Sequence, residues 1–340
     1  MILIDGSEGE GGGQVLRTAL ALSLITGQPF RIDNIRANRP RPGVMRQHVT
    51  AVEAACAIGG AECEELAVGA STLTFAPGRL RPGSHHFAVG TAGSTSLVLQ
   101  TVLPPLMLAG APSKLVLEGG THNIHAPPFD FIARTFLPIV GRMGPKVEAS
   151  LVRPGFYPAG GGRIEVTIDP ASALLPLDLT ERGELRRVEA RALVAALPGE
   201  IGLRELGAVE AVLRWPEESR RIEQLPDAFG PGNVLMLEAQ FDSVTEIATG
   251  FGQLGIPAQT VGQKAAKRMA GYLASGAFAG PYLADQLLLP LALAGGGRFT
   301  TVKPSLHTRT AAALIERFID VNFRIVEQAD GTHLVTVTGR

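Results

Sequence analysis

The chain has 340 residues, of which 45% are hydrophobic and 19% are charged, and its formal net charge is −1 at pH 7. This composition is typical of a globular protein with ample material for a core, and the length suits two domains or one large domain with an insertion. The near-neutral charge excludes a nucleic-acid partner held by the field of the whole chain, so any such site must be a local patch.

The first residues, MILIDGSEGE, lack the basic and apolar regions of a signal peptide. The longest apolar runs, near LVLQTVLPPLMLAG and QLLLPLALAGGG, are interrupted by Gln, Pro and Gly and fall short of the ~20 residues that a membrane span needs. Cys56 and Cys63 are too few for a disulfide framework and fit no metal-ligand spacing. We therefore expect a reduced, cytoplasmic setting and no membrane partner.

Residues 9–13 are rich in glycine and precede an apolar stretch that is typical of a helix. They do not form a P-loop, because no Gly-Lys-Ser/Thr follows, and Gln14 stands where a dinucleotide-binding pattern needs its third glycine. Such a turn can still bring backbone amides to a phosphate at a helix N-terminus. Glu8 and Glu10 would be costly beside that phosphate unless a divalent cation lay between them, although carboxylates also suit a helix N-terminus.

Residues 30–46, FRIDNIRANRPRPGVMR, read as a strand followed by a basic loop. The segment contains one Asp and five arginines: Arg31, Arg36, Arg39, Arg41 and Arg46. Arginine forks bind phosphate in a bidentate manner. A solvated basic loop is the alternative, but in a chain of near-neutral charge this cluster predicts a phosphodiester or terminal-phosphate partner.

Three segments, 17–39, 100–122 and 285–307, align without a gap and indicate an internal repeat. Each opens with a polar residue and continues as an apolar helix to a glycine ten positions later (Gly27, Gly110 or Gly295), where a left-handed backbone can end the helix. A strand-like run follows, then a polar residue twelve positions beyond the glycine, then a second helix. Coincidence between ordinary αβ units is the alternative, but two shared intervals in three copies favour duplication.

The alignment makes Arg17, Gln100 and Asp285 equivalent to one another, and likewise Arg39, His122 and His307. Polar residues at matching positions beside helix starts indicate three units that converge on a shared cleft, whereas solvated helix caps are the alternative. A single histidine such as His307 is often a packed bystander. Its pairing with Asp285 in the same unit favours a functional role.

Residues 183–276 lack the repeat and carry more charge. They hold two strand candidates, 188–197 and 233–241, and two probable helices, 203–215 and 264–275. We therefore expect a large domain formed by 1–182 and 277–340, with a smaller α/β domain at 183–276 inserted into it. The fold class predicted for the whole chain is α/β, of the α+β kind.

Several segments together resemble the family of RNA 3′-terminal phosphate cyclases: DGSEGEGGGQVLRTALALSLITGQPF, RPGVMRQH, GTAGSTSLVLQTVLPPL, RPGFYPAGGG, and YLADQLLLPLALAG with PSLH. The resemblance covers 1–182 and 277–340 and is looser over 183–276. It implies a large domain of three βαβαββ units, each similar to the C-terminal domain of bacterial translation initiation factor 3, with a small α/β insert.

The resemblance also implies an activity, which is ATP-dependent conversion of an RNA 3′-terminal phosphate to a 2′,3′-cyclic phosphodiester through a covalent histidine–AMP. It implies Mg²⁺ or Mn²⁺, RNA with a 3′-terminal phosphate as the partner, and a possible homodimer. His307 matches the adenylated histidine, and Glu10 and Asp285 match metal-associated carboxylates. The residues that match the nucleotide pocket are Gln100, Pro127, Tyr282, Leu283, Ala284, Asp285 and Gln286. Those expected to bind the RNA phosphate are Arg17, Arg36, Arg39 and Arg41.

The chemistry of His307 agrees with that role, because a helix N-terminus disfavours the imidazolium and favours an arriving phosphate. Attack on phosphorus needs a neutral ring nitrogen. No role is expected for His122 or His125. Two alternatives stay open: a non-catalytic cyclase-like scaffold in RNA processing, which should lack the nucleophile, and an enolpyruvyl transferase, which shares the repeated architecture but not PSLH and YLADQ.

Overall fold

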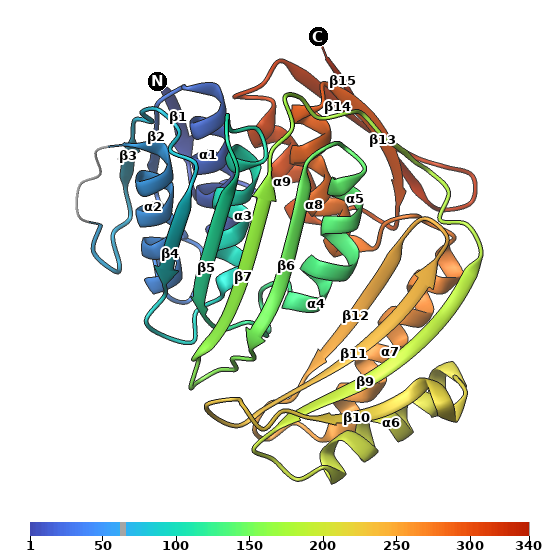
Figure 1. The fold of residues 1–340 in the computed structure, drawn as a ribbon. Helices are drawn as coiled ribbons and strands as arrows, with labels where there is room; N and C mark the ends of the chain where they lie inside the picture. The colour runs from blue at the N-terminus through green and yellow to red at the C-terminus, as the bar shows by residue number, and fades with distance from the viewer. Residues whose placement is uncertain (62–65, 340) are drawn as a thin grey trace.

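The computed structural model describes residues 1–61 and 66–339, and Figure 1 shows their arrangement. Cys63 lies outside the described residues, so the expectation about the two cysteines stays a prediction. The chain is mixed α/β with four separate sheets, as the sequence predicts. Among the described residues, no helix combines the length and the apolar character that crossing a membrane would require.

The first unit spans residues 2–75, and its described strands pair in the order β1-β2-β3. β2 pairs with β1 in parallel orientation and with β3 in antiparallel orientation. Its elements are β1 (Ile2–Asp5), α1 (Gly13–Thr26), β2 (Phe30–Asp33), α2 (Arg46–Gly59) and β3 (Leu73–Phe75).

The second unit spans residues 84–169, and its strands pair in the order β4-β5-β7-β6. Only β4 and β5 are parallel. Its elements are β4 (Ser84–Ala88), α3 (Thr95–Leu106), β5 (Ser113–Gly119), α4 (Phe129–Phe131), the π-helix η1 (Ile132–Phe136), α5 (Leu137–Gly141), β6 (Lys146–Arg153) and β7 (Gly162–Asp169).

The third unit repeats that pairing with the order β8-β13-β15-β14, in which β8 and β13 are the parallel pair. Its elements are β8 (Asp178–Leu179), α8 (Pro281–Leu293), β13 (Gly296–Thr301), α9 (Leu306–Ile315), β14 (Val321–Glu327) and β15 (His333–Gly339). The chain between β8 and α8 therefore interrupts this unit after its first strand.

The interrupting segment builds a sheet of its own, in the order β10-β9-β11-β12. Its elements are β9 (Leu185–Ala195), α6 (Glu200–Leu213), the 3₁₀-helix η2 (Glu217–Ser219), β10 (Arg220–Gln224), β11 (Gly232–Phe241), β12 (Thr245–Phe251) and α7 (Ala258–Ser275). The two strands and two helices expected here are present, while β10 and β12 were not expected. The domain boundaries at 183 and 276 stay a prediction.

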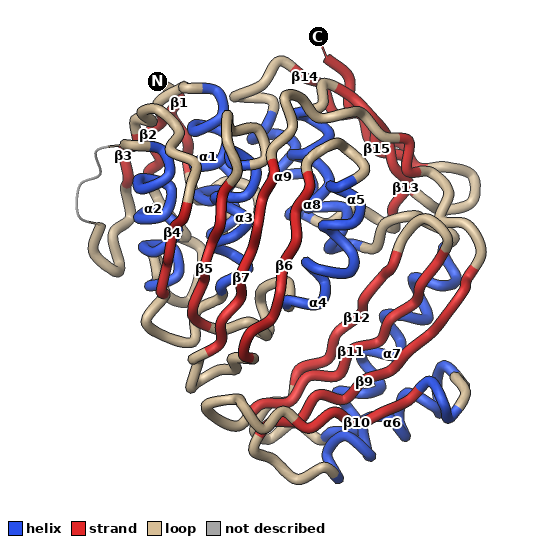
Figure 2. Tube along the Cα trace, in the orientation of Figure 1, coloured by secondary structure: helices blue, strands red, loops and turns tan. Residues whose placement is uncertain are grey.

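The helices of the three units occupy the middle of the large part, and the sheets lie outside them. Figure 2 shows these helices in blue behind the sheet that contains β4, β5, β7 and β6. Helix α1 contacts α2, α3 and α9, and α8 contacts α9. The apolar sides of α1 and α3, including Leu16, Leu20 and Leu99, are fully buried in one core. This packing brings the polar residues at the ends of these helices close together.

Two of the three predicted helix-ending glycines take the left-handed conformation, Gly27 with φ 70° and Gly295 with φ 72°. For Gly110 the prediction is wrong, since its φ is not left-handed and α3 already ends at Leu106. Pro104 and Pro105 lie in the last turn of α3. Because proline has no amide hydrogen, that turn lacks two donors, and the helix stops before reaching the glycine.

A buried carboxylate of the insert contacts the start of α8. Glu246 on β12 is 3% exposed, and its Oε2 accepts a hydrogen bond from the Gly280 amide at 3.2 Å. A Cβ at position 280 would overlap the Glu246 carboxyl group, so a larger residue there would displace this carboxyl group from the amide. Burial raises the pKa of Glu246 to about 8, although the Gly280 bond lowers it. The helix that carries residues 282–286 therefore begins against a carboxyl group of the insert.

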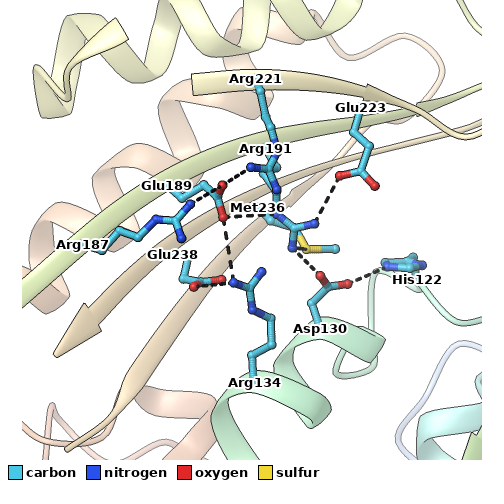
Figure 3. A network of polar contacts seen from close by, with 10 residues as sticks. All are labelled: His122, Asp130, Arg134, Arg187, Glu189, Arg191, Arg221, Glu223, Met236 and Glu238. Atoms are coloured by element: carbon cyan, nitrogen blue, oxygen red, sulfur yellow. Dashed lines mark hydrogen bonds and ion pairs between the residues drawn. The ribbon is translucent and has the colours of Figure 1, made fainter. Parts of the chain in front are cut away.

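A network of buried and half-buried charges joins the insert sheet to the helices after β5, as Figure 3 shows. Asp130 on α4 accepts hydrogen bonds from His122, with Nε2 to Oδ2 at 3.2 Å, and from Arg191 on β9. Arg134 on η1 reaches Glu238 on β11 at 2.9 Å. Other members lie on β9, β10 and β11: Arg187, Glu189, Arg221, Glu223 and Met236.

The charges of this network balance, with four arginines against four carboxylates. Asp130 is 8% exposed and Arg191 is also 8% exposed. Burial by itself would raise the pKa of Asp130, but His122 and Arg191 together hold it well below its usual range. Asp130 is therefore ionised and faces a buried guanidinium.

Removing the Asp130 charge should destabilise the protein, because Arg191 would remain buried with less compensation. We expect Asp130→Asn to cost ~3–5 kcal/mol of unfolding free energy, measured by urea denaturation. The matched control is Asp178→Asn, which breaks an exposed pair with Arg298 and should cost ~0–1 kcal/mol. Equal losses in the two variants would contradict this reading of the network.

Glu246 predicts a pH dependence of stability. The unfolded carboxyl group ionises near pH 4.5 and the folded one near pH 8, so between these values the unfolded chain has released a proton that the folded chain retains. The free energy of unfolding therefore falls as pH rises across this window, by roughly 1.4 kcal/mol per pH unit for one group. Glu246→Gln keeps an acceptor for Gly280 and should remove this contribution.

Urea unfolding at pH 5 and pH 8 measures the effect. Glu205 is also buried, and burial raises its pKa to about 7. Because Glu205 is still present in the Glu246→Gln variant, part of the fall in unfolding free energy with pH should remain. Glu148→Gln, at an exposed position on β6, is the control. A slope as steep in Glu246→Gln as in the wild type would show that Glu246 is ionised in the folded protein.

Candidate active site

His307 is the second residue of α9, directly after the helix cap. The Ser305 hydroxyl accepts a hydrogen bond from the Thr308 amide at 3.1 Å, which fixes the first turn. At this position the unpaired amides of the helix make a positive end. The His307 side chain is 48% exposed, so a ligand can reach it.

The hydrogen bonds of His307 determine which ring nitrogen is free. Its Nδ1 lies 2.8 Å from Oε1 of Gln14, and because an amide oxygen only accepts, Nδ1 carries the hydrogen. Burial lowers the pKa of His307, and the positive charges of Arg39 and Arg17 lower it further. The ring is therefore neutral at pH 7, with an unprotonated Nε2.

Glu10 lies beside that nitrogen, with Oε1 3.7 Å from His307 Nε2. Its backbone amide donates to the Thr310 hydroxyl of α9 at 2.9 Å, and its carboxylate forms an ion pair with Arg39. The Glu10 side chain is only 6% exposed, and its buried Oε2 has no hydrogen-bond partner. This oxygen has spare capacity to bind a cation or a donor.

Arg17 supplies a second positive charge close to His307. It makes no ion pair with any residue that the structure describes, and its buried Nε has no hydrogen-bond partner. Burial lowers the pKa of Arg17 to about 10. Nearby His48 is kept neutral, since burial, Arg17 and Arg36 lower its pKa to about 3. A half-buried cation without an ion-pair partner among the described residues suits an anionic ligand.

Asp285 lies on α8 and contacts the start of α9. Its Oδ1 accepts hydrogen bonds from the hydroxyls of Ser305, at 3.1 Å, and Thr308. Burial raises the pKa of Asp285 to about 6, although both hydroxyls lower it. Asp285 therefore links the helix of the predicted nucleotide residues to the helix of the predicted nucleophile.

One cavity brings the first repeat-equivalent set together: Arg17 from α1, Gln100 from α3 and Asp285 from α8 all line it. Gln286 lines it as well, and its Oε1 accepts a hydrogen bond from Gln100 Nε2 at 2.7 Å. The rest of the wall consists of Gln14 and Thr18 of α1 and of apolar side chains from α3, η1, α8 and α9. The three units thus converge on shared space at this set of positions.

The remaining residues predicted to bind the nucleotide differ in which groups they can present to a ligand. Tyr282 is 48% exposed, with the Arg268 guanidinium 5.9 Å from its ring centroid. Leu283 and Ala284 are 0% and 1% exposed, so their side chains belong to the core and leave only backbone groups for a ligand. Pro127 is half-buried in the loop between β5 and α4.

The second repeat-equivalent set does not converge completely. Arg39 and His307 both contact Glu10, whereas His122 is 2% exposed and bonded to Asp130. In the arginine loop, Arg36 donates to the carbonyl oxygens of Arg41 and Gly43 at 2.8 and 2.6 Å, so this side chain holds the loop in shape. Arg41 is exposed.

Sequence reasoning missed Gln14, His48 and Thr310. Gln14 was considered only as the residue that breaks a glycine pattern, yet it orients His307. The signal available for Thr310 was its position three residues after His307, which is about one helical turn. His48 ends the RPGVMRQH segment, but that segment alone does not show that Arg17 and Arg36 lower its pKa.

Comparison with known proteins shows the family of the chain. The family model described as RNA 3′-terminal phosphate cyclase matches residues 8–325. A protein of that name from Koribacter versatilis is 56% identical over 328 residues, covering 96% of this chain and 92% of the relative. The namesake from Ralstonia nicotianae is 49% identical, covering 97% and 95%, and that from Salmonella typhimurium is 46% identical, covering 99% of both chains. The chain belongs to the RNA 3′-terminal phosphate cyclase family.

Proposed function

We propose that this chain uses ATP to convert an RNA 3′-terminal phosphate into a 2′,3′-cyclic phosphodiester, through AMP bound covalently to His307. The observation that supports this most is the neutral, half-exposed His307 ring. Its Nδ1 is held by Gln14, and its free Nε2 lies at a helix N-terminus near Arg39 and Arg17. A nucleophile for phosphorus needs these properties.

In the first step His307 Nε2 attacks the α-phosphorus of ATP. An N–P bond forms, the bond from that phosphorus to the bridging oxygen breaks, and pyrophosphate leaves. The ring gains positive charge, and the Nδ1 hydrogen bond to Gln14 stabilises the tautomer that can react. Arg17 and the amides at the start of α9 offset the charge of the phosphate oxygens.

The nucleotide pocket is proposed to lie between α3 and α8. Gln100 and Gln286, which bond to each other, can offer amide groups to the nucleotide, and the exposed Tyr282 ring can stack on adenine. Asp285 acts through the hydroxyls of Ser305 and Thr308, which fix the start of α9. Leu283 and Ala284 can contribute backbone groups only, and Pro127 would bound the pocket from the loop before α4.

Two further steps complete the proposed reaction. An oxygen of the RNA 3′-phosphate attacks the phosphorus of histidine–AMP, which frees His307 and leaves AMP on the RNA end. The neighbouring 2′-hydroxyl then attacks the 3′-phosphorus, and AMP departs. This last step is intramolecular, where effective molarities on the order of 10⁵–10⁸ M are possible. Arg39 and Arg41, with Arg36 shaping the loop, are proposed to bind the terminal phosphate.

Glu10 is the residue that best fits a divalent cation. Its buried Oε2 has no partner, and among the described residues no group of three or more His, Cys, Asp or Glu could hold a metal ion. Mg²⁺ is commonly bound by one or two carboxylates together with substrate phosphates, which agrees with a single buried carboxylate. When bound, Mg²⁺ or Mn²⁺ would offset the charge of pyrophosphate. Asp285 as a second ligand stays a prediction, because its Oδ1 already accepts two hydroxyls.

The presence of His307, Gln100 and Asp285 in one place opposes a non-catalytic scaffold, which would not need them. Membership of the cyclase family opposes an enolpyruvyl transferase. The homodimer and the cytoplasmic setting stay predictions.

The covalent step has a direct test. Incubation with ATP labelled at the α-phosphate should label the protein, and His307→Ala should remove the label completely because no other nitrogen takes its place. His125→Ala, which changes an exposed histidine, is the control and should be labelled as well as the wild type. A label retained in His307→Ala would refute the assignment.

Arg39 should matter after the first step. We expect Arg39→Ala to retain self-adenylation while AMP transfer to 3′-phosphorylated RNA falls roughly ten- to a hundredfold, since a charged hydrogen bond contributes ~1.5–3 kcal/mol. The assay belongs at pH 8, where the His307 ring is neutral with or without the Arg39 charge.

Arg324→Ala, at an exposed position on β14, controls for the loss of any surface cation and should leave both steps unchanged. Loss of ATP labelling in Arg39→Ala as complete as in His307→Ala would assign Arg39 to the nucleotide step.

A further inference from the structure

Three aromatic rings are exposed among the described residues: Tyr157 at 78%, Phe229 at 66% and Tyr282 at 48%. Tyr282 belongs to the proposed nucleotide pocket, whereas the other two have no part in the chemistry above. Tyr157 lies between β6 and β7, and Phe229 lies between β10 and β11 of the insert. Figure 1 shows these two loops beside each other at the lower end of the molecule.

Phe229 is held in place by the β6–β7 region. Gly161 has φ +71°, and a Cβ there would overlap the Phe229 ring, so the ring lies directly against the glycine. The Arg153 guanidinium lies 4.0 Å from the ring centroid, and its Nε donates to the Gly161 carbonyl. The ring therefore has a fixed orientation with Arg153 over it, while Phe229 as a residue stays 66% exposed.

Tyr157 is presented by a tight loop with a buried base. Phe156 is 4% exposed and stacks on His122 at 5.3 Å between ring centroids. The Gly160 amide donates to the Phe156 carbonyl at 2.7 Å. The next residue, Gly161, is the one that touches Phe229. Tyr157 and Phe229 thus belong to one surface, to which the large part and the insert each contribute a ring.

The loop that carries Tyr157 packs against the segment before α3, and that segment contacts the start of α2. Gly160 packs on the backbone of Thr91 and Ala92, in the loop before α3. In the same loop, the Ser94 amide donates to Gln47 Oε1 at 3.1 Å. Gln47 lies next to Arg46, which is exposed, and α2 begins directly after the arginine loop. These contacts link the Tyr157 loop to the start of α2, which directly follows the arginine loop.

The chemistry of the surface favours unpaired nucleotides. Exposed aromatic rings stack on bases of any sequence, and an arginine beside them adds attraction for the phosphates between those bases. Asp227 is the acidic group of the Phe229 loop, but Arg153 lies over the Phe229 ring and Arg46 is exposed at the start of α2. Tyr, Phe and Arg are also enriched at protein interfaces, so a protein contact is the alternative outcome of the test below.

We propose that Tyr157 and Phe229 form a stacking platform for the single-stranded nucleotides that precede the 3′-terminal phosphate of the RNA. The proposal rests on the proposed function for its substrate. It predicts a length dependence: oligonucleotides too short to reach the rings bind through the terminal phosphate alone, and longer ones gain the stacking contribution.

The test compares 3′-phosphorylated oligoribonucleotides of two nucleotides and of about ten, a length in the range of single-strand sites. In Tyr157→Ala/Phe229→Ala, KM for the longer RNA should rise roughly 5- to 150-fold per ring, since stacking contributes ~1–3 kcal/mol per base. The values of kcat, KM for the dinucleotide and ATP labelling of His307 should stay at wild-type level. Tyr157→Phe keeps a ring and should behave as the wild type.

Leu254→Ala removes a fully exposed apolar side chain elsewhere on the insert and is the matched control. A double variant with unchanged KM for the longer RNA overturns the platform. So does a change of its sedimentation without a change of RNA binding, which would assign the rings to a protein contact.

Fluorescence anisotropy with a ten-nucleotide RNA without a 3′-phosphate separates this proposal from the proposed function. If the wild type binds that RNA more tightly than the double variant does, the platform stands even where no cyclisation occurs. If His307 is labelled but the two proteins bind the RNA equally, the proposed function stands and the platform fails.

Discussion

The short parallel pairing of β8 with β13 is the constraint on which the candidate site depends. It joins Asp178 to Arg298, 120 residues apart in sequence, and so completes the third unit around the inserted segment. An isolated bridge between Ala279 and Thr301 holds the returning chain against β13 just before α8 begins. Because α8 starts from that fixed point, Asp285 reaches the first turn of α9 and Gln286 reaches Gln100.

Much of this arrangement follows from local patterns. In each repeat, the number of residues from the first polar position to the glycine is set by the length of an apolar helix. The number of residues from the glycine to the second polar position is set by one strand. Segments with equal intervals therefore fold alike and place equivalent residues alike. For this reason the sequence predicts that Arg17, Gln100 and Asp285 share one space, which the structure shows. The same reasoning predicts the two strands and the two helices expected in the insert.

The failures have long-range causes. His122 occupies the position equivalent to His307, but Asp130 and Phe156 enclose it, and Arg191 of the insert compensates Asp130. Asp130 and Phe156 belong to the second unit and Arg191 to the insert, but all three lie outside the aligned segment 100–122. Gln14 was assessed only against the glycine that a dinucleotide-binding motif needs at that position. Its actual contact is with His307 on α9, 293 residues away in the sequence. Gly110 shows the opposite case, in which two adjacent prolines override the helix-ending preference of a correctly aligned glycine.

The contact of Glu246 with Gly280 bears on how freely the insert can be exchanged between proteins. An insertion whose two ends emerge close together is normally regarded as a module that can be cut out or replaced by a short linker. Here the insert also supplies a hydrogen-bond acceptor to the first turn of a helix in its host. A chimaera that transplants another insert must carry a carboxyl or amide group to that position, and a deletion leaves the Gly280 amide facing an empty space. The modularity of this chain is therefore partial, because the insert also makes a non-covalent contact with the start of α8.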